Sequence, residues 1–212
     1  MSTEQTSLEK NQEDRSRDAW FHFLYDLIWP FFNLIRPLRV IGRENIPEGP
    51  VVICPNHTTI GDPFYVVYAF GRHYPVRAMA KIQIMRVPVI GWFLSKAGVF
   101  GVDRGHADLK AVKTALKFLK DGNKLLLFPE GTRVKEGETG EAHTGAAMFA
   151  TRTGVPIVPI YISPKKRLFR KTDVIFGQPY HPEFEGRKPT PEDYQRIADD
   201  LMMRIRALGE QA

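Results

Sequence analysis

The 212-residue sequence contains one cysteine, Cys54, and this scarcity excludes two classes of site. A single thiol cannot build an internal disulfide framework, and it cannot supply the clustered thiolates of a zinc site. Long apolar runs are also absent: the longest stretch without Asp, Glu, Lys or Arg has thirteen residues, from Gly49 to Gly61. Because a spanning helix needs about 20 apolar residues, we expect no regular transmembrane helix. The default environment is reducing and cytosolic.

Residues 1–18 lack an apolar stretch and carry charge throughout, so we predict a disordered polar tail rather than a cleaved secretory signal. This tail holds three basic and five acidic residues, whereas the whole chain has 30 basic and 24 acidic residues and a formal net charge of +6. The rest of the chain is therefore basic, which suits nucleic acid, anionic lipid or a phosphorylated metabolite. We expect no nucleic-acid partner, because the sequence has no recognition-helix motif, no basic strand interleaved with aromatics and no zinc knuckle.

Residues 19–37 are the most aromatic part of the chain, with two Trp, four Phe and one Tyr. Pro30 is expected to break or kink a helix here, which predicts two short amphipathic helices. Trp and Tyr favour the boundary between membrane and water, where the ring is buried and the polar atom stays hydrated. This segment is therefore predicted to associate with one leaflet of a membrane, with packing on the protein's own core as the alternative.

Residues 38–212 alternate apolar runs of strand length with helical patterns. Asp108 to Lys120 repeats apolar residues at helical spacing, and a terminal amphipathic helix is predicted after Thr190 as cap and Pro191 as first helical residue. This alternation predicts one α/β domain, in which a largely parallel or mixed central sheet is covered by helices. The predicted strands are Leu38 to Gly42, Val51 to Cys54, Val76 to Ala80, Ala97 to Val102, Lys124 to Phe128, Val155 to Tyr161 and Val174 to Phe176.

The 165–171 segment, KKRLFRK, is the one dense cluster of charge, with five basic residues of seven. It predicts a solvated loop, with contact to anionic lipid as the alternative.

Two candidate catalytic residues follow the strand Val51 to Cys54, in the segment PNHTTIGDP. An imidazole ordinarily titrates near neutrality, so a histidine such as His57 can take a proton from an alcohol if a second group fixes its tautomer. Asp62, five residues later, could be that group, and the pair could activate a substrate hydroxyl for attack on an acyl carbonyl. The structural alternative is that Asp62 caps a helix that begins at Pro63, and that His57 has no catalytic role.

A second polar loop, FPEGTR, follows the strand Lys124 to Phe128. Arg133 could grip a phosphate with paired hydrogen bonds, Gly131 would let the backbone approach it, and Thr132 offers a hydroxyl. Glu130 is expected to hold Arg133 or Thr132 in place. Arg104 follows a third strand, so all three loops are expected at one edge of one sheet, where sites of α/β proteins collect.

Four blocks in this order resemble the glycerolipid acyltransferases typified by 1-acyl-glycerol-3-phosphate acyltransferase. NHTTIGDP resembles the HX4D motif of the family, GVFGVDR its second block, FPEGTR its third and VPIVPI its fourth, from Asn56 to Ile160. The sequence departs from the family at Thr59, where serine is common, and at Gly61, where a bulky residue often stands.

The resemblance implies that His57 is the general base and Asp62 its partner. It implies that Arg104, Glu130 and Arg133 form the site for the acceptor's phosphate, with Gly131 and Thr132 in the same loop. Pro159 in the fourth block would shape the pocket or bind the acyl chain.

The implied reaction moves a fatty acyl group from acyl-carrier protein or acyl-CoA to the free hydroxyl of lysophosphatidate, giving phosphatidic acid, with no metal or other cofactor. The protein would work as a peripheral or monotopic enzyme on the cytoplasmic face of an anionic membrane. Two alternatives stay open: another acceptor, such as glycerol 3-phosphate, another lysophospholipid or lyso-ornithine lipid, and a lipid-binding membrane protein without turnover.

Overall fold

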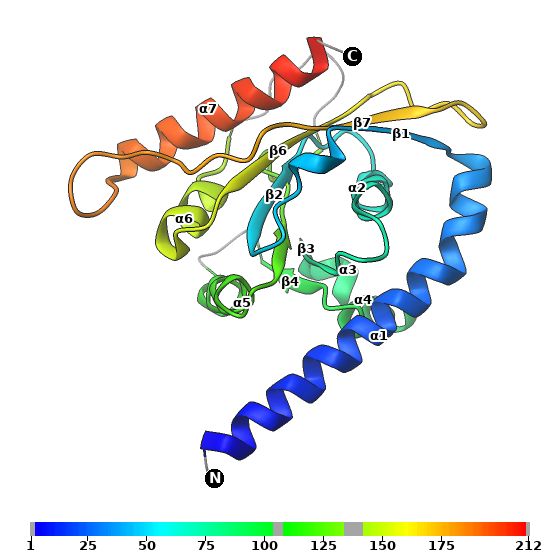
Figure 1. The fold of residues 1–212 in the computed structure, drawn as a ribbon, viewed down its shortest axis with the longest axis horizontal. Helices are drawn as coiled ribbons and strands as arrows, with labels where there is room; N and C mark the ends of the chain where they lie inside the picture. Colours follow the sequence, from blue (N-terminus) through cyan, green and yellow to red (C-terminus); the bar gives the residue numbers. More distant parts are fainter. Residues whose placement is uncertain (1–2, 104–107, 134–141, 211–212) are drawn as a thin grey trace.

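A computed structural model describes residues 3–103, 108–133 and 142–210 of the chain. In this part of the chain, seven strands form one sheet in the order β1-β7-β6-β2-β5-β3-β4 (Figure 1). β6 and β7 pair antiparallel, and every other neighbouring pair is parallel. The prediction of a largely parallel or mixed sheet is confirmed. The strands are β1 (Leu38–Ile41), β2 (Val51–Pro55), β3 (Val76–Lys81), β4 (Phe100–Val102), β5 (Lys124–Leu126), β6 (Ile157–Ile162) and β7 (Thr172–Phe176).

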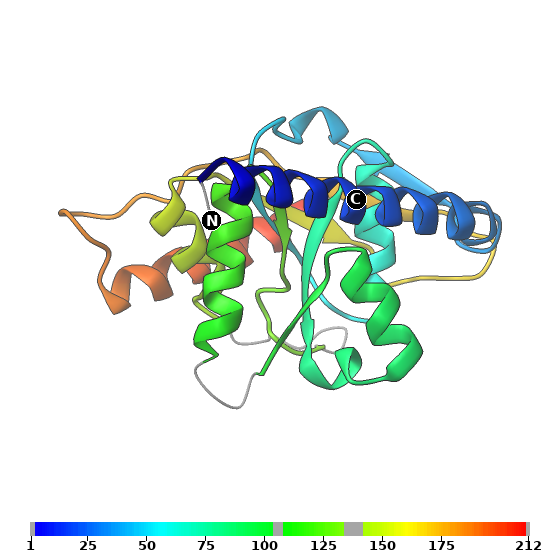
Figure 2. The same cartoon turned by 90° about the horizontal axis from the view of Figure 1, so that it is seen from below.

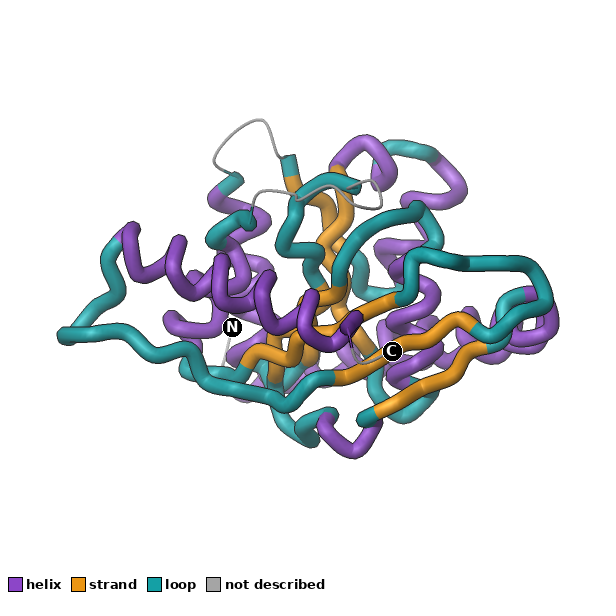
Figure 3. Tube along the Cα trace, turned by 90° about the horizontal axis from the view of Figure 1, so that it is seen from above, coloured by secondary structure: helices purple, strands orange, loops and turns teal. Residues whose placement is uncertain are grey.

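Helices cover both faces of this sheet, so that the strands lie in the middle of the molecule (Figure 3). α5, α6 and α7 lie on one face and α2 on the other (Figure 1). The helices are α1 (Thr3–Ile35), α2 (Asp62–Phe70), α3 (Ile82–Met85), α4 (Pro88–Lys96), α5 (Leu109–Lys120), α6 (Gly145–Thr153) and α7 (Pro191–Glu210), with a short 3-10 turn at Arg43–Asn45.

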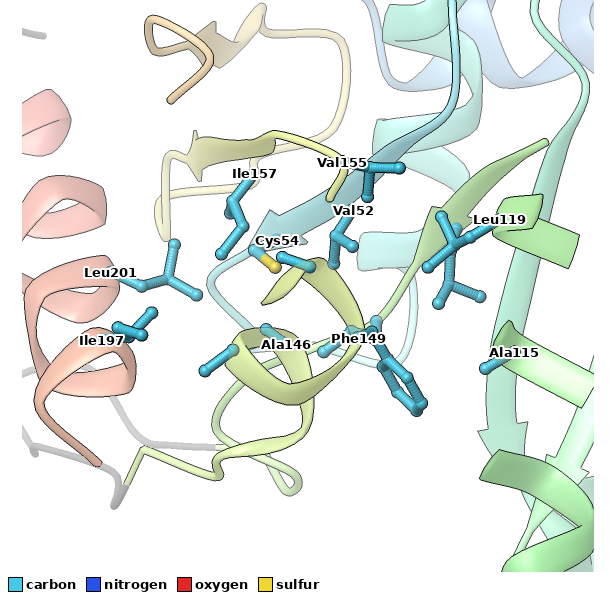
Figure 4. Packing of buried hydrophobic residues seen from close by; sticks show 14 of the residues in the cluster. Val52, Cys54, Ala115, Leu119, Ala146, Phe149, Val155, Ile157, Ile197 and Leu201 are labelled. Carbon is cyan, nitrogen blue, oxygen red and sulfur yellow. The ribbon is translucent and has the colours of Figure 1, made fainter. Parts of the chain in front are cut away.

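The sequence of the central strand β2 is an unbroken apolar run for a structural reason. All five of its residues are buried, because successive side chains point to opposite covered faces. Val52 and Cys54 pack against α5, α6 and α7 (Figure 4), whereas Val51 and Ile53 pack against α2. Two separate cores therefore hold the strand whose end carries His57.

The two amphipathic helices predicted from the sequence are confirmed. α5 begins after Asp108, whose carboxylate accepts the backbone N–H of Ala111 at 2.9 Å. Before α7, Thr190 and Asp193 form a reciprocal cap, in which the Asp193 N–H donates to Thr190 Oγ1 at 3.2 Å and the Thr190 N–H donates to Asp193 Oδ2 at 3.0 Å. The buried side of α7 packs against the core that it shares with α5 and α6 on one face of the sheet.

α1 is one helix, so the prediction of two short helices separated at Pro30 was wrong. Its course bends toward β1 over the last turns (Figure 1), and it crosses in front of the sheet in Figure 2. Three aromatic side chains on either side of the proline, Tyr25, Trp29 and Phe32, all contact the ring of Tyr68 of α2 in edge-on or tilted geometry. This packing holds the helix together across the residue that removes a backbone hydrogen bond.

Part of the aromatic segment packs on the protein, and part faces outward. Phe21 and Tyr25 are buried against Tyr68, whereas a stripe at helical spacing on α1 is exposed: Phe23, Leu27, Phe31 and Leu34. α1 also runs unbroken through residue 18, and the disorder predicted for residues 1–18 stays a prediction. Over the described ranges, no helix is both long and apolar enough to cross a bilayer.

Candidate active site

The parallel part of the sheet brings the predicted loops to one edge. β5 lies between β2 and β3 and is parallel to both, and β4 is parallel to β3. The loops that carry His57, Glu130 and Asp103 therefore leave the sheet on the same side. The shared edge predicted from the sequence is confirmed for these loops, whereas Arg104 lies outside the described residues.

His57 and Asp62 form a hydrogen-bonded pair. The Nδ1 atom of His57 lies 3.0 Å from Asp62 Oδ2, and the Asp62 side chain is fully buried while 14% of the His57 side chain is exposed. An ionised Asp62 accepts the proton of Nδ1 and so fixes the tautomer in which Nε2 has a free lone pair. The arrangement can therefore remove a proton from a hydroxyl that approaches Nε2.

Asp62 does not cap α2, which was the structural alternative. It is the first residue of the helix, after Gly61, and its carboxylate turns back to the loop before it. Oδ2 accepts the backbone N–H groups of Thr58 at 2.6 Å and Thr59 at 2.8 Å, and Oδ1 accepts the Thr59 hydroxyl at 2.7 Å. A serine at position 59 could donate the same hydroxyl bond, so the departure at Thr59 preserves this contact.

Burial alone would raise the pKa of Asp62, but the hydrogen bonds that it accepts outweigh burial. Donation from His57, Lys166 and the backbone of Thr59 holds the pKa of this carboxyl well below its ordinary 3.8. Asp62 is therefore negatively charged at neutral pH. That charge stabilises the imidazolium that forms when His57 takes a proton.

Two residues that the sequence analysis did not single out hold the His57 loop. The side-chain amide of Asn56 pairs with the backbone of Ile162 in both directions, donating at 3.0 Å and accepting at 2.7 Å. The ring of Phe128 stacks on His57 with 4.0 Å between centroids. Both lie inside quoted motifs, Asn56 directly before the histidine and Phe128 at the start of FPEGTR. Their place inside these two motifs was the one signal in the sequence.

Glu130 has a different partner from the two predicted. Its side chain is buried, at 7% exposure, and Oε2 accepts the backbone N–H of His57 at 3.2 Å. Burial raises the pKa of Glu130 from its ordinary 4.5 to about 7, and the hydrogen bond from His57 offsets only part of this increase. Glu130 thus links the two polar loops, from the end of β5 to the end of β2.

Gly131 forms the turn that presents the rest of the FPEGTR loop. It has a φ of 66°, in the left-handed region, and a Cβ at this position would collide with the imidazole of His143. Beyond it, Thr132 and Arg133 are exposed at the edge of the sheet. The loop therefore exposes a hydroxyl and a guanidinium, while the side chain of Glu130 is buried.

The predicted solvent exposure of Lys166 is wrong. The 165–171 segment was predicted to be solvated, and four of its five basic residues are exposed. The Lys166 side chain is instead only 4% exposed, and its Nζ lies 2.6 Å from Asp62 Oδ1. Nothing in this basic sequence indicates that one of its lysines contacts a buried carboxylate elsewhere in the chain.

Other chemistry-bearing groups lie outside this constellation. Cys54 is fully buried within the sheet, and burial raises the pKa of its thiol, so it does not serve as an exposed nucleophile. Pro159 lies in β6 opposite Cys54 and packs on Gly177. Within the described ranges, no group of His, Cys, Asp and Glu side chains has the arrangement of a metal site.

Comparison with known proteins gives one consistent family. Residues 37–163 match the family described as Acyltransferase. The chain is 32% identical over 196 residues to the 1-acyl-sn-glycerol-3-phosphate acyltransferase of Bacillus subtilis, which covers 89% of this chain and 96% of that protein. A chloroplastic 1-acyl-sn-glycerol-3-phosphate acyltransferase of Brassica napus is 35% identical over 156 residues, covering 69% of this chain and 43% of that protein. The chain thus spans less than half of the plant relative's length.

The fold also has a solved counterpart. The crystal structure of the 1-acyl-sn-glycerophosphate (LPA) acyltransferase PlsC from Thermotoga maritima superposes with a TM-score of 0.61 at 21% identity, covering 100% of this chain and 84% of that one. The likeness supports the arrangement of sheet and helices.

Proposed function

This chain belongs to the acyltransferase family, and we propose that it transfers a fatty acyl group from an acyl thioester to the free hydroxyl of 1-acyl-glycerol 3-phosphate. The product is phosphatidic acid, and the released group is the thiol of acyl-carrier protein or coenzyme A. The observation that carries the proposal is the His57–Asp62 pair, with 3.0 Å between Nδ1 and Oδ2, at the edge of the sheet. The names of the relatives support lysophosphatidate as the acceptor.

The reaction is a single displacement in which His57 acts twice. Its Nε2 takes the proton of the acceptor hydroxyl as the oxygen attacks the thioester carbonyl, and Asp62 stabilises the imidazolium. When the tetrahedral intermediate collapses, the carbon–sulfur bond breaks and the imidazolium returns its proton to the leaving thiolate. Because a thioester is already activated, this chemistry requires no metal or redox cofactor.

The phosphate of the acceptor binds at the FPEGTR loop in this proposal. Arg133 is exposed there and offers paired N–H donors, and Thr132 adds a hydroxyl. Arg104 is assigned to the same phosphate from its motif. Glu130 supports the site from below through the His57 backbone, and its raised pKa leaves it partly neutral at pH 7 beside an anionic ligand.

We assign the exposed apolar surface of α1 and of α3–α4 to contact with the membrane. Trp20 of α1 stacks edge-on against Trp92 of α4 at 5.4 Å between centroids, so the two surfaces adjoin. The 165–171 segment, with exposed Leu168 and Phe169 among its basic residues, would add contact with anionic headgroups on the cytoplasmic face. The apolar residues of the two surfaces are Phe23, Leu27, Phe31, Leu34, Ile84, Val87, Val89, Ile90 and Trp92.

The experiment is an acyl-transfer assay of the purified protein, with products identified by mass spectrometry. Acyl-carrier-protein and coenzyme A thioesters are each offered with lysophosphatidate, glycerol 3-phosphate, lysophosphatidylcholine and lyso-ornithine lipid. We expect phosphatidic acid to form fastest with lysophosphatidate. Faster transfer to another acceptor would correct the substrate, and binding of lipid without transfer from either donor would reject the enzyme.

A further inference from the structure

Lys166 holds an unusual position for a lysine in a basic surface segment. Its Nζ contacts Asp62 Oδ1 at 2.6 Å, donates to the hydroxyl of Thr58 at 2.5 Å and lies 5.8 Å from the centroid of the Tyr65 ring. The side chain thus leaves the surface and ends beneath the loop that carries His57. No other basic side chain of the 165–171 segment is buried.

Burial of an ammonium group is unfavourable unless an opposite charge and hydrogen bonds compensate it. The Asp62 side chain, fully buried, provides that charge, and Thr58 provides a further acceptor. The backbone of the lysine is also fixed, because Nη1 of Arg36, at the end of α1, donates to the Lys166 carbonyl at 2.6 Å. Side chain and backbone therefore place the ammonium group at one point.

The two oxygens of Asp62 have separate partners. Oδ2 receives His57 and the two backbone N–H groups, whereas Oδ1 receives Lys166 and the Thr59 hydroxyl. Because Lys166 holds Oδ1, the carboxylate cannot rotate without breaking an ion pair. Oδ2 is thereby kept toward Nδ1 of His57.

We propose that Lys166 is a positioning residue for acyl transfer, which orients the Asp62 carboxylate and neutralises part of the charge that acts on His57. The inference rests on the proposed function, in which His57 must be unprotonated to accept a proton. Among the described residues, Glu130 approaches the pair from the loop after β5, and Lys166 and the Tyr65 ring of α2 lie on the Asp62 side. Arg206 of α7 acts on Glu130. Within the described ranges, Lys166 is the lysine or arginine that forms an ion pair with Asp62.

The kinetic test uses Lys166→Met, which keeps the length of the side chain and removes its charge. Activity is measured against pH in neutral detergent micelles, so that a loss of membrane contact does not enter. We expect kcat to fall by about 10–100-fold, as when other groups that orient a catalytic side chain are removed. The KM for lysophosphatidate should stay the same, because the Lys166 side chain is buried and its ammonium group is directed at Asp62.

The pH profile separates this role from general damage. Without Lys166, the full charge of Asp62 favours the imidazolium form of His57, so the acidic limb of kcat/KM should move to higher pH. Lys120→Met, at the exposed end of α5, is the matched control and should leave the profile in place. A Lys166→Met enzyme with wild-type kcat and an unmoved limb would overturn the proposal.

A second measurement does not depend on turnover. The carboxyl carbon resonance of Asp62, assigned by its loss in Asp62→Asn, is titrated by NMR in both proteins. We expect it to titrate at higher pH in Lys166→Met than in the wild type, and identical titrations would refute the pairing. If the wild type transfers no acyl group while the titrations differ, the proposed function fails and the Lys166–Asp62 pair stands.

Discussion

Glu130 provides a quantitative test of how the two polar loops are joined. Its buried carboxyl accepts one backbone N–H from His57, and burial raises its pKa to about 7. Glu130→Gln keeps an oxygen that can accept the same N–H but removes the ionisation. The substitution therefore isolates the electrostatic consequence of burying this group.

The sign follows from linkage between proton binding and folding. Between pH 4.5 and 7 the folded protein binds a proton at Glu130 that the unfolded chain has lost, so the wild type loses stability as the pH rises through this window. The difference between 4.5 and about 7 corresponds to about 3 kcal/mol at 1.36 kcal/mol per pKa unit. Glutamine does not titrate, so Glu130→Gln should escape this loss.

The assay is urea unfolding of both proteins at pH 4 and pH 8, followed by circular dichroism. The stability of Glu130→Gln relative to wild type should be higher at pH 8 than at pH 4 by up to about 3 kcal/mol. Thermal unfolding should show the same trend, at about 2–4 °C per kcal/mol for a chain of this size. A relative stability that does not change between the two pH values would mean that Glu130 is solvated, and the link through the His57 backbone would be wrong.

Three further predictions concern the site and the apolar surface. Asp62→Asn should lower kcat by about 10²–10⁴-fold, and a wild-type kcat would contradict the dyad. The same substitution leaves Lys166 buried without its charge partner, so it should also reduce the free energy of unfolding by about 3–5 kcal/mol. Arg133→Ala should raise the KM for lysophosphatidate about 10–100-fold, since a charged hydrogen bond contributes about 1.5–3 kcal/mol, and an equal rise for an uncharged acceptor would refute a phosphate contact. Phe31→Ser should weaken co-sedimentation with lipid vesicles about tenfold or more, whereas Leu109→Ser on α5 should not; equal effects would remove α1 from the membrane surface.

The strands could be predicted because the sheet is covered on both faces. Each residue of β2 is buried, so apolar composition alone marks the strand, and the pairing direction then brings its end beside that of β5. Edge positions were less accurate: the strand predicted from Ala97 begins at Phe100, because α4 extends to Lys96 and a turn follows. Continuity of α1 through Pro30 depends on contacts with Tyr68 of α2, which local sequence does not contain.

Contacts within the site could be predicted where the spacing of residues in one loop sets the geometry. Contacts between segments that are distant in the sequence could not be predicted. His57 and Asp62 lie on either side of one turn, so five residues of separation bring them together. The partners of Glu130 and Lys166 come from loops far away in the chain, and each side chain reaches a group on the His57–Asp62 loop. Lys166 was predicted to be solvated because charged side chains usually are. Its burial beside an acidic partner can be seen only in the folded structure.

The central claim is that the imidazole of His57 removes the proton from the acceptor hydroxyl. The most direct test measures phosphatidic acid formed by His57→Ala and by wild type from the same acyl thioester and lysophosphatidate, with circular dichroism to establish that both are folded. The account predicts rapid product formation by wild type and a loss of about 10²–10⁴-fold in the variant. A folded His57→Ala protein that forms phosphatidic acid at the wild-type rate would contradict it.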